Sequence, residues 1–341
     1  MKLLIITQKV DKNDPILGFF HRWIEEFAKH VEQLTVICLF AGEYSLPENV
    51  TVLSLGKENG ESRLKYVWKF YTYIWRERKR YEKVFVHMNQ EYVLLGGILW
   101  KLFGKKIYMW RNHHAGSLMT DGAALLCAKV FCTSKYSYTA KYKKTVLMPV
   151  GIDTKMFKVM PDIKRKAKSI LFLSRISPIK KPHILINVLC ELKDYDFVAS
   201  IYGDALDKDG KYFEDIKKKV EECGLDRRVQ FFKGIPNYEC PKVYNEHEVF
   251  VNLSSSGMYD KTIFEAMACG CIVLVSNENL RGEIDDFYLI KEDGQRELFD
   301  KISRIVSREH PYQVDMSLVD YVSHKHSLEQ LVDKLMYEQT D

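Results

Sequence analysis

Short apolar runs alternate with amphipathic segments along the first half of the chain. Residues 3–6 form an apolar run typical of a buried strand in a parallel sheet, and apolar side chains recur at helical spacing over 20–31. We expect an apolar helix over 92–103, and further strands at 34–40, 84–86, 107–110, 130–133 and 146–149. Strands that alternate with helices in this way predict a parallel α/β domain.

The same pattern begins again after Gly151. A charged segment over 158–168 leads into a helix over 214–223 and into strands at 170–173, 197–202, 229–232, 249–253 and 272–275. Near the C-terminus, apolar side chains share one face of an amphipathic helix over 326–337. The sequence therefore predicts two α/β domains, 1–152 and 153–321, and a C-terminal segment, 322–341.

Composition narrows the class of protein. The chain has 341 residues, of which 46% are hydrophobic and 28% charged, as in a soluble globular protein with more than one core. The net charge of +5 is a mild basic excess, which suits a protein that binds phosphates or touches an anionic membrane. No nucleic-acid partner is expected, because the excess is small and no nucleic-acid-binding motif is present.

Cysteine usage and the lengths of apolar runs indicate the compartment. The eight cysteines have no zinc-ligand spacing, so we expect reduced, buried thiols in a cytoplasmic protein and no metal site. The N-terminal apolar run is too short for a signal peptide. The longest apolar stretch, 92–100, is far below the ~20 residues that a transmembrane helix needs.

Candidate chemistry falls at strand ends, where open parallel sheets bind their ligands. Gly18 lies in the loop after strand 3–6, just ahead of a helix, where a glycine allows close backbone approach. Arg175 follows strand 170–173 directly, and Lys180 comes shortly after it. Two such cations suit a diphosphate leaving group, because they neutralise the charge that grows as its bond breaks. A plain turn glycine and solvated surface cations are the alternatives.

The most specific stretch is 254–275. It begins with a polar loop, of which Ser255 and Ser256 are part, and continues as a helix from about Lys261 to Gly270. The free amides of 259–262 form an anion site at the start of this helix. Glu265, about one turn in, is placed to accept hydrogen bonds from a ribose diol; the alternative is an ordinary glutamate on the helix surface.

Four stretches together carry a family resemblance: VLMPVGIDTKMF, ILFLSRISPIKK, IYGDALDKDGKYFEDIKKKVEECGLDRRVQFFKGIP and TIFEAMACG. In this order and spacing they resemble the retaining glycosyltransferases of family 4, which have the GT-B fold. The match is strong over the second half of the chain and weaker over the first. The resemblance implies two Rossmann-like parallel-sheet domains that face each other across a cleft, with the C-terminal helix crossing back to the first.

The resemblance also implies an activity. A hexosyltransferase of this kind moves a sugar from a nucleotide-diphosphate sugar, such as a UDP- or GDP-sugar, to an acceptor. It does so with retention of configuration and without a metal or other cofactor. The acceptor would be a glycan or a lipid-linked molecule, as in polysaccharide biosynthesis. The expected location is the cytoplasm or the inner face of the membrane.

Position by position, the resemblance assigns roles in the second half. Arg175 and Lys180 would hold the donor diphosphate, with the backbone near Tyr259, Lys261 and Thr262 in support, and Glu265 would bind the nucleotide ribose.

In the first half, Gly18 would lie beside the diphosphate and the acceptor. His113 would contact the donor sugar, with His114 as a near-equal candidate because the register is open by one residue. Loop histidines bonded to backbone are the alternative. His87, which ends strand 84–86, is expected to be structural.

The sequence departs from the family at one motif. The family usually carries two glutamates separated by seven residues; Glu265 matches the second, but the first position holds Gly257. The usual glycine-rich donor loop reads Met258, Tyr259, Asp260 and Lys261 instead. The first glutamate normally contacts the donor sugar, so its absence leaves the sugar, and activity itself, open. Asp260 is placed to reach sugar hydroxyls, and Lys261 to reach a phosphate.

Residues 62–83 suggest a weak peripheral membrane contact. Eight basic residues are interleaved there with aromatic ones, and a helix of this kind can lie on an anionic bilayer. We favour the alternative of an ordinary helix with solvated cations, whose Leu64, Val67, Tyr71 and Ile74 pack on the sheet.

Other functions fit the sequence less well. A GT-B-type sugar-nucleotide epimerase would lack the combination of Arg175, Lys180 and EAMACG. A catalytically degenerate nucleotide-sugar-binding protein is suggested only by Gly257. A nicotinamide-dependent oxidoreductase would need the G-x-G-x-x-G fingerprint after strand 3–6, which is absent.

Overall fold

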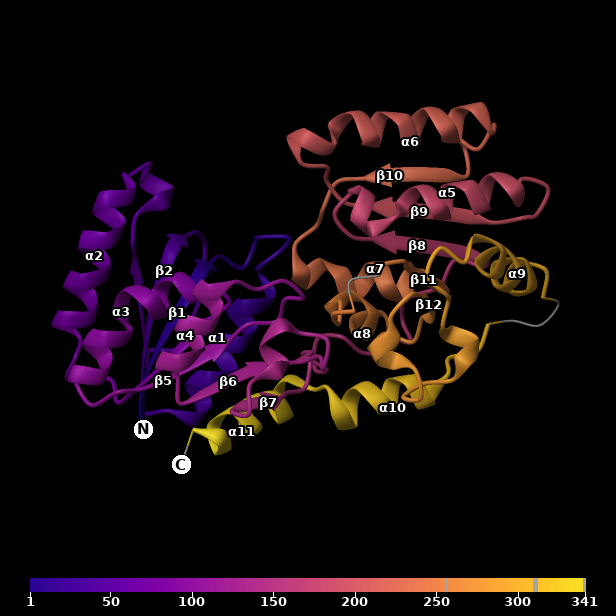
Figure 1. The fold of residues 1–341 in the computed structure, drawn as a ribbon. Helices are drawn as coiled ribbons and strands as arrows, with labels where there is room; N and C mark the ends of the chain where they lie inside the picture. The colour runs from indigo at the N-terminus through magenta and orange to yellow at the C-terminus, as the bar shows by residue number, and fades with distance from the viewer. Residues whose placement is uncertain (255–256, 309–311, 340–341) are drawn as a thin grey trace. The chain divides into compact units, whose positions relative to one another are not determined.

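The computed structural model describes residues 1–254, 257–308 and 312–339, so Ser255 and Ser256 of the expected polar loop lie outside the described residues. The chain forms two compact units (Figure 1). Unit 1 consists of Met1–Gly151 together with Leu328–Asp341, and unit 2 consists of Ile152–Ser327.

Unit 1 is built on a seven-stranded parallel sheet with the order β3-β2-β1-β4-β5-β6-β7. Its strands are β1 (Lys2–Val10), β2 (Gln33–Ala41), β3 (Val50–Ser54), β4 (Lys83–His87), β5 (Lys106–Trp110), β6 (Lys129–Cys132) and β7 (Thr145–Leu147). All but β3 lie where the apolar runs predict them. β3 is an edge strand whose side chains are only partly buried, so its apolar pattern is weak.

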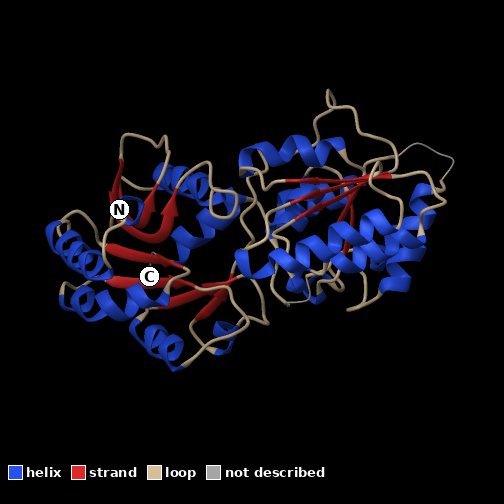
Figure 2. Cartoon of the chain, turned by 90° about the horizontal axis from the view of Figure 1, so that it is seen from above, coloured by secondary structure: helices blue, strands red, loops and turns tan. Residues whose placement is uncertain are grey.

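Helices cover both faces of this sheet (Figure 2). α1 (Phe19–His30) and α11 (Leu328–Glu338) pack on one face, together with Leu3 and Ile5 of β1. α2 (Arg63–Arg76), α3 (Gln90–Leu102) and α4 (Leu118–Leu126) pack on the other, together with Leu4 and Ile6. Because both faces are covered, the central strands are apolar on both sides and read as continuous apolar runs.

Unit 2 is built on a five-stranded parallel sheet with the order β10-β9-β8-β11-β12. Its strands, all at predicted places, are β8 (Ser169–Leu173), β9 (Val198–Tyr202), β10 (Val229–Phe232), β11 (Val249–Asn252) and β12 (Ile272–Val275). Its helices are α5 (Pro182–Glu191), α6 (Gly210–Glu222), α7 (Cys240–Glu246), α8 (Lys261–Ala268), α9 (Gln295–Val306) and α10 (Met316–Lys325). Two parallel α/β units are therefore the architecture.

The helix expected over 326–337 is α11 (Leu328–Glu338), and a second helix, α10, precedes it. α10 packs on α8 in unit 2, whereas α11 belongs to unit 1. Between them, Ser327 bridges to Ile152, whose N–H donates to the carbonyl of His326 at 2.9 Å. None of the helices in the described ranges is long and apolar enough to cross a bilayer.

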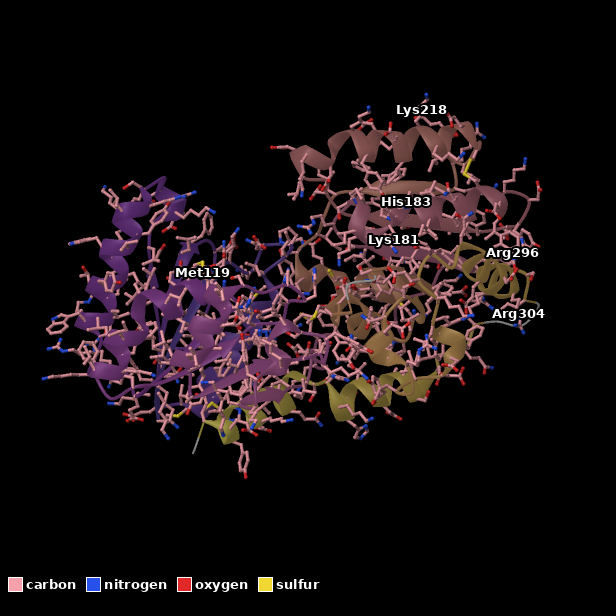
Figure 3. The ribbon with its side chains drawn as sticks, viewed as in Figure 1. Met119, Lys181, His183, Lys218, Arg296 and Arg304 are labelled. Carbon is pink, nitrogen blue, oxygen red and sulfur yellow. A yellow bond between two sulfur atoms is a disulfide. The ribbon has the colours of Figure 1, made fainter. Side chains whose placement is uncertain are left out.

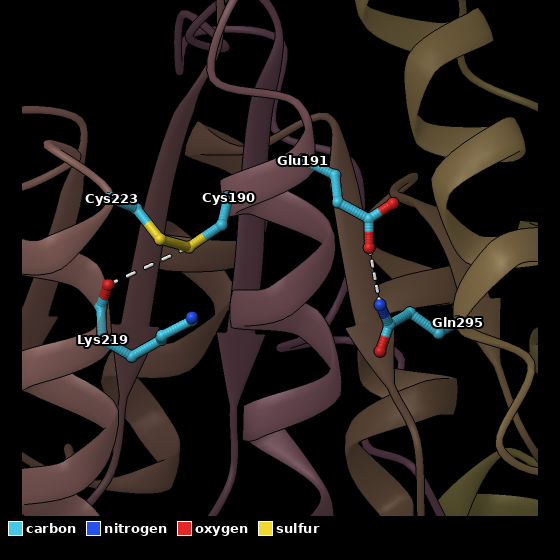
Figure 4. The surroundings of a disulfide bond; sticks show 5 residues. All are labelled: Cys190, Glu191, Lys219, Cys223 and Gln295. Atoms are coloured by element: carbon cyan, nitrogen blue, oxygen red, sulfur yellow. Dashed lines mark hydrogen bonds between the residues drawn. A yellow bond between two sulfur atoms is a disulfide. The ribbon is translucent and has the colours of Figure 1, made fainter.

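Two cysteines form a disulfide, which corrects the expectation that all eight are reduced. Cys190 in α5 and Cys223 at the end of α6 are bonded, with their Cα atoms 5.6 Å apart (Figure 4). They stand 33 residues apart in sequence, so only the packing of α5 against α6 brings them together. The other six cysteines, all in described parts of the chain, are free and buried, as expected.

α2 packs on the sheet through side chains other than those expected. Phe70 and Ile74 are buried, whereas Leu64, Val67 and Tyr71 are exposed by 83%, 38% and 38%. Of the expected set, only Ile74 was right. The reason is that α2 carries two apolar stripes, and the stripe through Phe70 and Ile74 is the one that joins the core.

Candidate functional site

The start of α8 lies where two neighbouring strands of unit 2 end. β8 and β11 pair in parallel at the middle of the sheet, so their carboxyl ends lie at the same edge. The chain leaving β8 passes through a short helical turn, Pro178–Lys180, and the chain leaving β11 runs into α8 at Lys261. Lys180 and the start of α8 are thereby brought into contact.

Asp260 is the centre of this contact. As the residue that caps α8, it accepts hydrogen bonds from the backbone N–H and the hydroxyl of Thr262, at 3.4 and 3.0 Å. Lys180 Nζ lies 2.6 Å from Asp260 Oδ2, and Asn252 Nδ2 donates to the same oxygen at 3.1 Å. Because Asn252 is the last residue of β11, the network ties the ends of both strands to the helix.

The pKa of Asp260 reflects this network. Burial raises it, but the charge of Lys180 and the hydrogen bonds from Lys180, Asn252 and Thr262 prevail and lower the pKa to about 2. Asp260 is therefore a carboxylate at neutral pH and balances the charge of Lys180. A diphosphate bound here would have to share the ammonium of Lys180 with Asp260.

Glu265 is buried, so the alternative of a surface glutamate is wrong. It is 4% exposed, and its two carboxylate oxygens accept from Asn237 Nδ2 and from the Tyr244 hydroxyl, both at 3.1 Å. Burial raises the pKa of Glu265, against the effect of the positive charge of Lys261, and burial also lowers the pKa of Lys261. Each oxygen of Glu265 keeps a second acceptor position, so a further donor can still be accommodated.

The loop before α8 is held by a pair of asparagines. Asn279 Nδ2 donates to the carbonyl of Gly257, and Asn277 Nδ2 donates to that of Met258 at 2.8 Å. The Tyr259 hydroxyl donates to the Asn279 carbonyl at 3.3 Å. Gly257 has a φ of 66°, which a glycine adopts without strain and a glutamate does not. The observed conformation of this loop therefore favours a glycine at position 257 over a glutamate.

The remaining cations near β8 are arranged differently. Arg175 follows β8 directly, and its side chain is exposed. Lys181, which is adjacent to Lys180 and labelled in Figure 3, forms ion pairs with Asp293 at 2.7 Å and Glu292 at 3.4 Å. Of the two neighbouring lysines, Lys180 thus pairs with Asp260 at the start of α8, whereas Lys181 pairs with acidic residues at 292–293.

The other candidate residues lie in unit 1. A Cβ on Gly18 would meet the Asp14 carbonyl at 2.5 Å, so a glycine is needed for the close approach of the loop to itself. His113 and His114 follow β5, are exposed and stack with ring centroids 4.5 Å apart. His113 Nδ1 accepts from the Ala115 N–H at 2.9 Å. His87, by contrast, is 2% exposed and stacks on Phe20, as a structural residue does.

Several residues of the site were not predicted from the sequence. Asn252 carried a usable signal, because a polar residue closes an otherwise apolar strand at the end where ligands bind. Asn237, Tyr244, Asn277 and Asn279 carried none, since each reaches the site from a separate segment only in the folded unit.

The family match lies within one of the two units. Residues 154–317, all within unit 2, match the family model for glycosyl transferases group 1. The GDP-mannose-dependent alpha-(1-6)-phosphatidylinositol monomannoside mannosyltransferase of Mycolicibacterium smegmatis is 28% identical over 146 residues, which make up 37% of each chain. The chain spans about a third of the length of the curated relatives it matches.

Solved structures are similar over the whole chain. HepE of Anabaena in complex with UDP superposes with a TM-score of 0.77, at 17% identity and with 100% of both chains covered. Sucrose-phosphate synthase of Thermosynechococcus elongatus gives a TM-score of 0.75, at 15% identity, over 100% of this chain and 99% of that one. The chain has the GT-B fold, as predicted. The fold and the family match of unit 2 together support a glycosyltransferase.

Proposed function

We propose that the chain is a retaining glycosyltransferase, similar to those of family 4, that transfers a hexose from a nucleotide-diphosphate sugar. The observation that carries this proposal is the meeting of Lys180, Asn252 and Asp260 at the start of α8. A helix start with a fixed cation beside it is a site for an anion, and this one lies inside the segment that matches glycosyl transferases group 1.

The candidate site residues of unit 2 then have the following roles. Lys180 and the exposed Arg175 hold the two phosphates of the donor, and the backbone near Thr262 supports them. Glu265 accepts hydrogen bonds from the ribose while Asn237 and Tyr244 hold its carboxylate in place. In this proposal Asp260 keeps Lys180 at the start of α8 until the donor arrives, and its carboxylate then accepts hydrogen bonds from the sugar hydroxyls.

Unit 1 supplies the remaining contacts in this proposal. Gly18 lies beside the phosphates and the acceptor, and His113 or His114 contacts the donor sugar. The donor is a UDP- or GDP-sugar, and the acceptor is a glycan or a lipid-linked molecule on the cytoplasmic side. We propose that no metal or other cofactor takes part.

The proposed transfer needs no protein nucleophile. The acceptor hydroxyl attacks the anomeric carbon from the side on which the nucleoside diphosphate leaves, so the configuration is retained. The bond from that carbon to the phosphate oxygen breaks as the new glycosidic bond forms. A phosphate oxygen takes the proton of the acceptor, while Arg175 and Lys180 stabilise the departing charge.

A second candidate function is nucleotide-sugar binding without transfer. Two observations favour it: Gly257 stands where the family has a sugar-contacting glutamate, and Asp260 already balances the charge of Lys180. The first would weaken the hold on the sugar, and the second would weaken stabilisation of the leaving group.

A screen of nucleotide sugars separates these functions. The chain as described would be incubated with UDP-, GDP- and ADP-sugars, and its thermal unfolding followed. A true donor at 100 times its dissociation constant adds ~2.7 kcal/mol to the free energy of unfolding. Any donor found would then be analysed by NMR for release of the nucleoside diphosphate and for the anomeric configuration of the product.

The outcomes are distinct. Release with a retained anomeric configuration supports the transferase, binding without turnover supports the second candidate, and an epimerised nucleotide sugar would indicate an isomerase. If no nucleotide sugar raised the unfolding temperature, both proposals would be wrong.

A further inference from the structure

Exposed apolar side chains concentrate on three helices of unit 1. Among the described residues, 25 large apolar side chains are exposed, and eleven of them lie on α2, α3 and α4. We call this set the apolar face: Leu64, Val67, Trp68, Tyr71, Trp75, Leu95, Ile98, Leu102, Leu118, Met119 and Leu125. Single exposed apolar residues are normal, but a gathered set marks a surface that binds something apolar.

The three helices that carry the apolar face are neighbours in the fold. On α2 its members recur at helical spacing, in a stripe beside the one that joins the core. The Tyr71 hydroxyl donates to the carbonyl of Leu95 at 3.0 Å, which joins α2 to α3. A Cβ on Gly97 would meet the Leu126 side chain at 2.8 Å, so α3 and α4 approach closely. Met119 marks the α4 part of the face in Figure 3.

A pocket of about 660 Å³ opens beside this face. Val67 and Leu95 belong to both the pocket and the apolar face, and Leu39, Leu55 and Phe70 form part of its inner wall. Aliphatic and aromatic side chains make up most of the lining, and Lys57, Arg63, Glu61 and Glu91 are its charged members. The pocket gives the face room for a hydrocarbon chain.

The basic excess of the chain gathers around the same helices. Residues 57–106 carry twelve Lys and Arg against five Glu, a net charge of +7, whereas the whole chain carries +5. The rest of the chain is therefore slightly acidic. Glu61 is paired with Lys69 at 2.9 Å, and Glu77 with Arg76 at 2.8 Å, so part of the negative charge is neutralised locally. Exposed apolar side chains interspersed with cations, as on α2, suit an anionic lipid surface.

We propose that the apolar face of α2, α3 and α4 docks on an anionic lipid bilayer, with Trp68 and Trp75 at the lipid boundary and one hydrocarbon chain in the adjacent pocket. The basic excess favours this occupant over a second copy of the chain, because two such faces would repel each other. Exposed tryptophans flanked by Lys and Arg are typical of membrane interfaces. The proposal does not depend on the transferase function.

Tryptophan fluorescence offers a direct test. The chain has five tryptophans, of which Trp23, Trp100 and Trp110 are buried, so quenching by brominated acyl chains would report on Trp68 and Trp75. The chain should cofloat with vesicles of phosphatidylglycerol and phosphatidylcholine at low salt, and brominated chains should quench its emission. Trp68→Phe with Trp75→Phe should keep most of the binding and lose the quenching. Binding without quenching in the wild type would overturn the proposal.

Two sets of variants separate the apolar and the electrostatic parts. Trp68→Ser, Leu102→Ser and Leu118→Ser together should weaken vesicle binding at least about 100-fold. Arg63→Gln, Lys65→Gln and Lys101→Gln should weaken it about 100-fold at low salt and little at high salt. The matched controls change exposed residues elsewhere: Leu206, Met316 and Tyr337 to Ser, and Lys208, Lys211 and Lys218 to Gln.

Three outcomes would contradict the proposal. The first is no binding to anionic vesicles at low salt. The second is equal loss of binding in the test and control variants. The third is a wild-type dimer in sedimentation that the apolar variants convert to monomers without any vesicle binding, which would make the face a self-association surface.

Discussion

Asp260 sets the charge at the start of α8. It takes the place of a glycine in the usual donor loop of the family that the sequence resembles, and it pairs with the lysine proposed to hold the donor. Its lowered pKa means that the folded chain binds its proton less tightly than the unfolded chain does. The pair therefore stabilises the fold whenever the carboxylate is ionised.

The pH dependence of stability should show this pair. The contribution of Asp260 is present above the ordinary aspartate pKa of 3.8 and is lost as the pH falls toward about 2. The wild type should lose about 2 kcal/mol over this range relative to Asp260→Asn, as measured by urea unfolding. Asp226→Asn, at an exposed site, is the control. If Asp260→Asn followed the wild type at every pH, the ion pair would be without energetic effect.

Contacts of this kind lie beyond single-sequence reasoning. Lys180 and Asp260 stand far apart in the chain, and the sequence could place each at a strand or helix end but not foresee that their charges would pair. The burial of Glu265 was equally hidden, because its partners Asn237 and Tyr244 carry no local signal. The strand-end rule still placed Lys180 and Asp260 at the same edge of the sheet, where they are in contact.

At the scale of elements, the break between α10 and α11 is held by a buried histidine. His326 is 8% exposed, packs against the rings of Phe264 and Tyr259, and lies 3.1 Å from the Tyr321 hydroxyl through Nε2. Burial lowers the pKa of His326 to about 4, with Lys325 acting in the same direction and Glu283 against it. The neutral imidazole is the form that fits between these helices.

Acid should therefore loosen this junction. Above pH 6.5 His326 is neutral in both states, and between pH 6.5 and about 4 the unfolded chain takes up a proton that the folded chain resists. The wild type should lose about 3 kcal/mol of stability across this range relative to His326→Gln, in denaturant titrations. His324→Gln, two residues earlier and exposed, should behave like the wild type. Parallel curves for wild type and His326→Gln would refute this account.

The elements themselves were largely predictable. Continuous apolar runs located β8, β11 and β12. Strands that are covered on both faces carry apolar residues on both sides, so their apolar runs are uninterrupted. β3 was missed because it is a half-buried edge strand. The side of α2 that packs on the sheet was predicted wrongly, because the helix carries two apolar stripes. The sequence alone does not show which of the two is buried against the sheet.

At the scale of the whole molecule, the two units share a fold but not their chemistry. Unit 2 holds the matched glycosyl transferase segment and the polar site at α8, whereas unit 1 holds the basic excess and the apolar face. A chain so divided would bind a water-soluble donor through one unit and meet a lipid surface through the other. The two proposals stand on separate residues, so each can fail alone.

The central claim is that the start of α8, with Lys180, receives the donor diphosphate, and two adjacent lysines test it. Calorimetric affinity for UDP and GDP, with turnover of any donor found, would be measured for Lys180→Ala and Lys181→Ala. Lys180→Ala should lose at least about 10-fold in affinity and ~100-fold in turnover, because the diphosphate loses a fixed cation. Lys181→Ala, whose lysine pairs with Asp293 instead, should remain within about twofold of the wild type. Equal effects of the two substitutions, or none from either, would contradict the claim.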